Sequence, residues 1–294
     1  MTRPTLSIRE ACLRASSLLA ERGVEDSRQA AEWLLLHLLR SDRTRLFLHW
    51  EEPFPAELAP LWEEAVRRRA QGEPVQYITG EQEFYGLAFR VNPSVLIPRP
   101  ETELLVEAVI RIGRELWPEP GDSPLLLDIG TGSGAIPVSI AVQCPGWRIC
   151  AVDISPAALD TARSNAADNG VAERITFLPG DLLLPAAEAG VDADILVSNP
   201  PYIPSSDIPG LQREVRDHEP VLALDGGEDG LSFYRRIIGQ MELLPHIPQC
   251  VGFEVGFGQA DAVVQLLRET GRWEEIRVIK DLAGIQRHVL AVRR

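Results

Sequence analysis

One short segment, Ser198 to Tyr202, carries residue types that can hold a planar nitrogen, and it follows directly on the apolar run 193–197. Proline donates no backbone N–H and fixes its own φ, so Pro200 and Pro201 end the run in a stiff corner. The side-chain oxygen of Asn199 and the carbonyl of Pro200 can accept both hydrogens of an amide or an aromatic amine. Two fixed acceptors would orient such a nitrogen and bias it towards sp³ character, while Tyr202 stacks on the flat face of the group. These residues also occur in ordinary turns, so the chemical interpretation depends on what lies beside them.

A glycine-rich loop follows the apolar segment 125–129 and opens a predicted helix. Glycines let the backbone pass close to a ligand at a helix N-terminus, where unpaired N–H groups point outward. The spacing also fits the dinucleotide fingerprint G-x-G-x-x-[GA], and a loop of this kind can exist without a ligand. The loop comprises Gly130, Thr131, Gly132, Ser133 and Gly134.

Two further acidic residues, Asp153 and Asp181, follow the apolar segments 148–152 and 175–178. A carboxylate about twenty residues beyond a glycine loop can accept hydrogen bonds from ribose hydroxyls, which suits Asp153. Asp181 can accept a bond from the exocyclic amine of adenine, with Leu182 packing on the ring. Either acid could instead cap a helix or lie in a solvated turn. Taken together at one edge of a sheet, they predict a crevice for a nucleoside-bearing ligand.

The elements that must position these residues alternate between strand and helix from residue 125 onward, which predicts an α/β fold with a mostly parallel sheet covered on both faces. The last two strands are close in sequence, and we expect them to be antiparallel. The seven expected strands are 125–129, 148–154, 174–178, 193–198, 249–255, 274–280 and 287–292.

The first 73 residues predict a bundle of helices only, starting at a capping box from Ser7 to Glu10. The consecutive arginines 67–69 are interpreted as a solvated helix face rather than a contact for a partner. Residues 74–98 predict a linker with a short β-hairpin, and a helix with acidic residues in its first turn follows. We therefore expect an N-terminal helical domain (1–73), a linker (74–98) and an α/β domain (99–294).

Composition narrows the classes of function. The chain has 294 residues and a net charge of −14, of which residues 1–73 contribute −1 and the rest −13. So acidic a domain is poorly suited to gripping a phosphate backbone non-specifically. Four scattered cysteines without a CxxC pair predict neither a disulfide framework nor a metal site. No apolar run is long enough to span a bilayer and no secretory signal is evident, so we expect a cytoplasmic protein.

The motifs together resemble a known family. In this order, DIGTGSG (128–134), AVDIS (151–155), GD (180–181) and SNPPY (198–202) resemble the Rossmann-like class I S-adenosylmethionine-dependent methyltransferases that alkylate planar nitrogens. The wider sequence is similar to one branch, the protein-glutamine N5-methyltransferases of release factors (the HemK/PrmC family). Residues 74–107, 218–238, 253–259 and 281–289 carry this second resemblance, so it covers nearly the whole chain.

The resemblance implies a substrate, a cofactor and residue roles. The substrate would be the glutamine in the Gly-Gly-Gln motif of class I peptide-chain release factors, recognised by the N-terminal helices of a monomer without nucleic-acid or membrane partners. The cofactor would be S-adenosylmethionine, released as S-adenosylhomocysteine. The loop from Gly130 to Gly134 would hold its methionine part, Asp153 its ribose, and Asp181 and Leu182 its adenine. Catalysis would lie with Asn199, Pro200 and Tyr202, which clamp the glutamine together with Pro201, Asn199 also adjoining the cofactor.

Four alternatives remain open from the residues themselves. A glutamine methyltransferase could act on a ribosomal protein instead. An adenine-N6 methyltransferase of nucleic acid uses the same corner on a flipped-out base, although the acidic domain argues against it. A nicotinamide-dependent oxidoreductase explains the glycine loop and Asp153 but leaves the corner at Asn199 without a role. A non-catalytic binding module would leave both Asn199 and Tyr202 unused.

Overall fold

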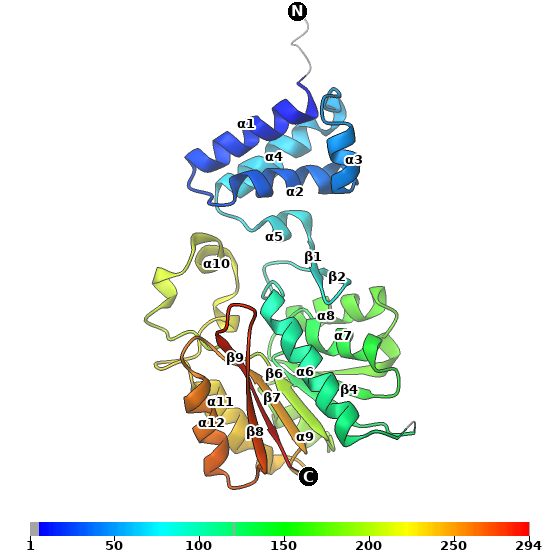
Figure 1. Cartoon of the computed structure of the whole chain (residues 1–294), viewed down its shortest axis with the longest axis vertical. Helices are drawn as coiled ribbons and strands as arrows, with labels where there is room; N and C mark the ends of the chain where they lie inside the picture. The colour runs from blue at the N-terminus through cyan, green and yellow to red at the C-terminus, as the bar shows by residue number, and fades with distance from the viewer. Residues whose placement is uncertain (1–5, 120, 294) are drawn as a thin grey trace, which may run out of the picture. The chain divides into compact units, whose positions relative to one another are not determined.

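The computed structural model describes residues 6–119 and 121–293, which form two compact units (Figure 1). One unit holds the chain up to Gly80 together with Gln212–His218, and the other holds the remainder. Among these described residues, no helix combines the length and the apolar composition needed to cross a membrane.

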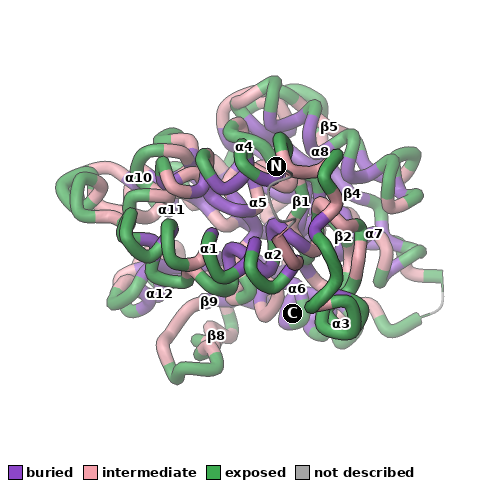
Figure 2. Tube along the Cα trace, turned by 90° about the horizontal axis from the view of Figure 1, so that it is seen from above, coloured by how far each residue is buried: buried purple, intermediate pink, exposed green. Residues whose placement is uncertain are grey.

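The first unit consists of helices and their connections. They are α1 (Ile8–Glu21), α2 (Ser27–Leu39), α3 (Arg43–Leu48), the 3-10 turn Ala56–Leu58, α4 (Ala59–Ala70), α5 (Val75–Thr79) and α10 (Arg213–His218). The predicted capping box starts α1, because the Glu10 N–H donates to Ser7 Oγ at 3.2 Å and the Ser7 N–H donates to Glu10 Oε2 at 3.0 Å. Buried and exposed stretches alternate within single helices, as expected where one face of a helix packs on a core (Figure 2).

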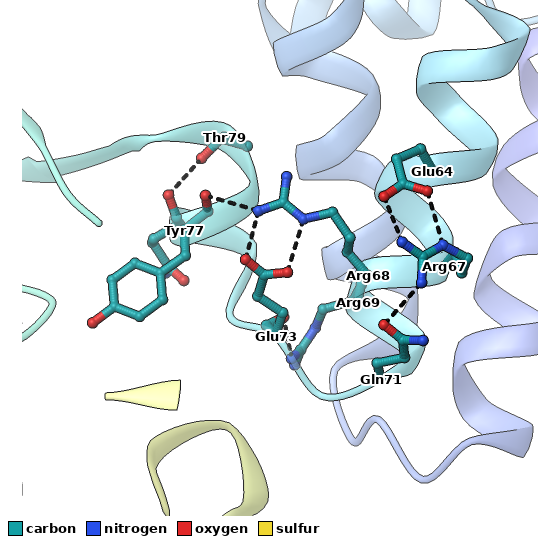
Figure 3. Close-up of polar contacts among 9 residues, drawn as sticks. Glu64, Arg67, Arg68, Arg69, Gln71, Glu73, Tyr77 and Thr79 are labelled. Carbon is teal, nitrogen blue, oxygen red and sulfur yellow. Dashed lines mark hydrogen bonds and ion pairs between the residues drawn. The ribbon is translucent and has the colours of Figure 1, made fainter. Parts of the chain in front are cut away.

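The three consecutive arginines at the end of α4 do not form a uniformly solvated face. Arg67 pairs with Glu64 at 2.5 Å and Arg68 with Glu73 at 2.5 Å (Figure 3). Arg69 is buried, and its Nη2 lies 2.6 Å from Glu214 Oε2 in α10. The interpretation as a solvated face is therefore correct for the half-exposed Arg67 and wrong for Arg69, since a buried guanidinium needs an acidic partner.

The second unit combines a short hairpin with a large sheet and its covering helices. The strands are β1 (Glu81–Phe84), β2 (Leu87–Arg90), β3 (Leu125–Ile129), β4 (Arg148–Asp153), β5 (Ile175–Pro179), β6 (Ile195–Ser198), β7 (Cys250–Glu254), β8 (Glu275–Lys280) and β9 (Gln286–Val292). The helices are α6 (Pro100–Leu116), α7 (Ala135–Gln143), α8 (Pro156–Asp168), α9 (Leu184–Glu188), α11 (Ser232–Gln240) and α12 (Ala260–Glu269). Short 3-10 turns lie at Ala172–Arg174, Ile208–Gly210, Val221–Ala223 and Met241–Leu243.

The seven-stranded sheet has the order β5-β4-β3-β6-β7-β9-β8, in which β9 runs antiparallel to both of its neighbours. This confirms the predicted α/β fold with a mostly parallel sheet and an antiparallel last strand. Alternate residues of a strand face opposite cores: Leu126 packs with side chains of α6 and α7, whereas Leu127 packs with those of α11 and α12. Figure 1 shows these two layers of helices on either side of the sheet.

Two further features compare the sequence with the structure, the four cysteines and the helix α10. All four cysteines are free and buried, as is usual for cysteines that act as small apolar core residues. The helix α10 is absent from the prediction, because its six residues are mostly charged, none of them is buried, and no apolar period marks them.

Gly113 in α6 allows a close approach to the Trp147 ring. A Cβ built at Gly113 would lie 2.1 Å from Trp147 Cη2, whereas one at Gly239 near the end of α11 would meet no atom within 4 Å. We predict that Gly113→Ala lowers the free energy of unfolding by about 1–3 kcal/mol through overpacking. The matched control Gly239→Ala should leave it unchanged or raise it by up to about 1 kcal/mol, because alanine favours a helix. Urea unfolding measures both, and equal stability of the two variants would contradict the close packing.

Candidate active site

A cavity of about 330 Å³ opens at the carboxyl ends of β3, β4, β5 and β6. This is the edge at which open α/β sheets bind ligands, and the volume suits a small-molecule site. The cavity brings together ten of the twelve predicted site residues, while Gly134 and Tyr202 lie outside its lining. The ten are Gly130, Thr131, Gly132, Ser133, Asp153, Asp181, Leu182, Asn199, Pro200 and Pro201.

The glycine loop turns the backbone towards the cavity. Gly130 and Gly132 have φ of +73° and +55°, where a side chain is strained, and a Cβ on either would meet no protein atom within 4 Å. Because both glycines line the cavity, that space is available to a ligand. Gly134 has a packing role instead: it precedes α7, and a Cβ there would lie 3.1 Å from the Cβ of Ala162 in α8.

Asp153 ends β4 and fixes the loop. Its carboxylate accepts the N–H of Gly132 and the N–H of Ser155, each at 2.8 Å. The helix α8 is capped by the Ser155 hydroxyl, which accepts the Ala158 N–H, so the cap interpretation of Asp153 is wrong. Burial raises the pKa of Asp153, and the hydrogen bonds from the backbone oppose this rise. The carboxylate is thus held at the cavity wall, where a ribose could reach it.

Asp181 and Leu182 lie beyond the end of β5, with a neighbour that the sequence did not predict. Arg236 of α11 lines the same cavity, forms an ion pair with Asp181, and lies over the Phe233 ring at 5.7 Å. Leu182 is buried and has a φ of +52°. Arg236 therefore occupies Oδ2 of Asp181. The predicted hydrogen bond from an adenine amine would have to be accepted by Oδ1 or by a remaining lone pair of Oδ2.

The corner after β6 is fastened on several sides. The Ser198 hydroxyl donates to the Ile129 carbonyl at 2.6 Å, which ties β6 to β3. The Asn199 Nδ2 donates to Thr102 Oγ1 at 3.2 Å. Beyond the prolines, the Gln259 side chain donates to the Tyr202 carbonyl at 2.8 Å. Such supports hold the acceptors of the corner in place, as a reaction dependent on orientation requires.

Tyr202 does not form part of the cavity wall. Its side chain packs against the apolar core on the α11 and α12 face, and a Cβ at Gly256 would lie 3.0 Å from its Cδ2. Burial raises the pKa of Tyr202, so the phenol stays protonated. The predicted stacking of Tyr202 on a substrate group is therefore not visible in the described cavity, because the ring is engaged by the loop after β7.

Asp128 is a residue to which the sequence analysis gave no role. It is buried within β3, directly before the glycine loop, and neither carboxylate oxygen has a hydrogen-bond partner among the described residues. Burial raises the pKa of Asp128 to about 7, although the nearby Thr131 hydroxyl opposes the rise. Its place in the pattern DIGTGSG was the available signal. Asp128 does not itself line the cavity, but the residues that follow it, Ile129 and Gly130, do. An unpaired buried carboxylate behind that wall favours positive charge on a ligand in the cavity, and S-adenosylmethionine carries a sulfonium and an ammonium group.

Solved structures share the fold of this chain. The N-terminal domain of human METTL16 in complex with SAH matches with a TM-score of 0.53 at 17% identity, over 71% of this chain and 76% of that one. The human methyltransferase 10 domain containing protein also gives 0.53, at 19% identity over 71% and 89%. A family model described as "Methyltransferase small domain" matches residues 111–214. The fold with its glycine loop is that of the class I methyltransferases.

Sequence relatives define the family. The release factor glutamine methyltransferase of Moorella thermoacetica is 45% identical over 98% of this chain and 99% of its own, and that of Bacillus subtilis is 41% identical over 97% and 98%. A second model, "PrmC N-terminal domain", matches residues 10–80. The chain belongs to the release factor glutamine methyltransferase family. This confirms the predicted enzyme class, a methyltransferase, and the predicted cofactor, S-adenosylmethionine.

The raised pKa of Asp128 gives a prediction on stability. Below about pH 4 the Asp128 carboxyl is protonated in both the folded and the unfolded protein, so its contribution to the free energy of unfolding is fully present in the ligand-free protein. This contribution is lost as the pH rises towards 7, because the unfolded state then ionises more readily than the folded state. The variant Asp128→Asn should therefore gain stability relative to the wild type, on the order of a few kcal/mol, between pH 4 and pH 8.

Denaturant titrations at several pH values measure this gain. The exposed Asp160 of α8 provides the control, because Asp160→Asn should follow the wild type at every pH. A difference between Asp128→Asn and the wild type that is independent of pH would contradict the buried, raised pKa.

Proposed function

We propose that this protein transfers the methyl group of S-adenosylmethionine to the side-chain amide nitrogen (N5) of the glutamine in the Gly-Gly-Gln motif of class I peptide-chain release factors. The observation that carries the proposal is the corner Asn199–Pro200 on the wall of the cavity that the glycine loop also lines. Relatives of nearly the same length are release factor glutamine methyltransferases, which supports this substrate over a ribosomal protein. The same similarity supports the proposal over an adenine-N6 methyltransferase of nucleic acid and over a nicotinamide-dependent oxidoreductase.

The residues of the corner act by holding the amide. When bound, S-adenosylmethionine supplies an electrophilic methyl carbon on a sulfonium. Asn199 Oδ1 and the Pro200 carbonyl accept the two N–H groups of the glutamine and hold its nitrogen in line with that carbon. The glycine loop and Asp153 would hold S-adenosylmethionine, which would supply the methyl group and leave as S-adenosylhomocysteine, while the alkylated glutamine nitrogen would give up its N–H proton to solvent. A strong base is unnecessary because the nitrogen becomes far more acidic once it is alkylated.

A protein substrate agrees with the apolar side chains exposed at the same edge of the sheet. Phe257, in the loop after β7, is 78% exposed, and Leu222, which lines the cavity, is 57% exposed. Leu282, fully exposed, lies in the turn between β8 and β9, which reaches this edge because Glu254 at the end of β7 pairs with His288 near the start of β9. Exposed apolar groups around a site favour docking of another protein.

The other parts of the proposal concern organisation. The helical bundle of residues 1–73 recognises the release factor, the linker 74–98 connects it, and residues 99–294 carry the chemistry. The match of residues 10–80 to the PrmC N-terminal domain supports the first assignment. The enzyme acts in the cytoplasm, where release factors function, and as a monomer.

Methyl transfer from labelled cofactor tests the substrate. We expect label on a purified class I release factor, and none on the same factor when the glutamine of its Gly-Gly-Gln motif is replaced. Ribosomal proteins and adenine-containing DNA serve as the competing substrates. Label on either of these, with an unlabelled release factor, would contradict the proposal.

The clamp itself is tested by Asn199→Ala. Loss of one preorganised hydrogen bond to the reacting group should lower kcat about 100-fold or more. Binding of S-adenosylmethionine, measured by calorimetry, should change by no more than about threefold, because the glycine loop and Asp153 remain. Near-normal turnover in this variant would refute the clamp.

A further inference from the structure

Three side chains from distant parts of the sequence form a hydrogen-bonded chain beneath the corner. Thr102, in the first turn of α6, donates its hydroxyl hydrogen to Glu254 Oε2 at 2.6 Å. The Asn199 Nδ2 donates to the same Thr102 Oγ1 at 3.2 Å. Glu254 ends β7 and Asn199 follows β6, so the chain joins two neighbouring strands through the start of a helix.

The chemistry of the three groups fixes the direction of these bonds. A carboxylate oxygen only accepts, so the single hydroxyl hydrogen of Thr102 is used by Glu254. Thr102 Oγ1 is left with acceptor lone pairs alone, and it can therefore receive only the NH₂ end of the Asn199 amide. Because the amide is planar, Asn199 Oδ1 then points away from Thr102 and is free to accept a hydrogen bond from elsewhere.

The surroundings keep this arrangement rigid. Glu254 is 2% exposed and Thr102 is 5% exposed, so water does not compete for their hydrogen bonds. The backbone carbonyl of Glu254 accepts the Tyr234 hydroxyl at 2.8 Å, and its Oε2 lies 3.8 Å from Nε2 of the buried His288. A buried carboxylate is costly unless it is hydrogen-bonded, which gives Thr102 a strong partner.

We propose that Thr102 and Glu254 are positioning residues, which set the orientation of the Asn199 amide so that its oxygen, and not its NH₂ group, faces the substrate. The inference rests on the proposed function, in which Asn199 Oδ1 accepts an N–H of the glutamine. In the opposite orientation, the NH₂ group of Asn199 would face the NH₂ group of the substrate glutamine. Two hydrogen-bond donors would then face each other and repel. Neither residue touches the reacting atoms, and both act through Asn199.

The first test compares Thr102→Val, which keeps the shape but removes the hydroxyl, with Thr102→Ser, which keeps the hydroxyl. Thr102→Val should lower kcat for release-factor methylation about tenfold or more, as for the loss of one positioning hydrogen bond. Cofactor affinity should change little, whereas the melting temperature should fall, because the buried Glu254 carboxylate loses its hydrogen-bond donor. Thr102→Ser should restore kcat to within about threefold of the wild type. Thr176→Val, at an exposed site on β5 away from the cavity, is the matched control and should behave as the wild type.

The variant Glu254→Gln tests the direction of the hydrogen bonds, and it tests the positioning role independently if Thr102→Val fails to fold. Its NH₂ group can donate to Thr102 Oγ1, which releases the threonine hydrogen towards Asn199 and allows the asparagine amide to turn over. We expect a fall in kcat similar to that of Thr102→Val, without loss of cofactor binding. Wild-type kcat in a folded Glu254→Gln variant would overturn the proposal.

A double-mutant cycle separates positioning from packing. If Thr102 acts only through Asn199, Thr102→Val should cause no further loss of kcat in an Asn199→Ala background. The same loss in both backgrounds, or equal impairment by Thr102→Val and Thr102→Ser, would overturn the inference. Failure of the proposed function gives a different result, because Asn199→Ala alone would then retain near-normal turnover.

Discussion

An amide nitrogen shares its lone pair with the carbonyl, and it becomes a nucleophile only where the surrounding groups hold it out of that conjugation. The acceptors at Asn199 and Pro200 must therefore be fixed before the substrate binds. Acceptors that have to reorganise during the reaction stabilise the transition state less, because the reorganisation itself costs free energy. The fold meets this requirement by placing the corner at the end of a central strand. The Ser198 hydroxyl on the Ile129 carbonyl and the Gln259 side chain on the Tyr202 carbonyl brace it from both sides.

The cofactor end of the cavity depends on the same geometry of parallel strands. Because β3, β4, β5 and β6 all end at one edge, the glycine loop, Asp153 and the corner come together although 69 positions separate Gly130 from Asn199. Asp153 links two of these parts, because it accepts the N–H of Gly132 while it faces the cavity. A change in the order of strands would therefore affect cofactor binding and substrate orientation together.

The sequence predicted those features that arise from local patterns. Strands, glycine loop, acidic strand ends and the stiff corner each have a signature within a few residues, and parallel topology then brings them to one edge. The contacts of Asn199 with Thr102 and of Thr102 with Glu254 span 97 and 152 residues, and no local pattern marks them. Arg236 was missed for the same reason, since 55 positions separate it from Asp181. Asp128 has a local signal in DIGTGSG, but its lack of a hydrogen-bond partner depends on the packing around β3. The partly buried Tyr202 ring packs against the loop at Gly256, a contact that no local pattern marks.

The most direct measurement is a structure of the enzyme with S-adenosylhomocysteine and a release-factor fragment that carries the Gly-Gly-Gln motif. We predict that the glutamine nitrogen lies within hydrogen-bond distance of both Asn199 Oδ1 and the Pro200 carbonyl, facing the sulfur of the product cofactor. We also expect the Asn199 NH₂ group to remain hydrogen-bonded to Thr102 Oγ1 in this complex. A glutamine side chain bound away from this corner, with its nitrogen turned from the sulfur, would show that Asn199 and Pro200 do not hold the reacting amide.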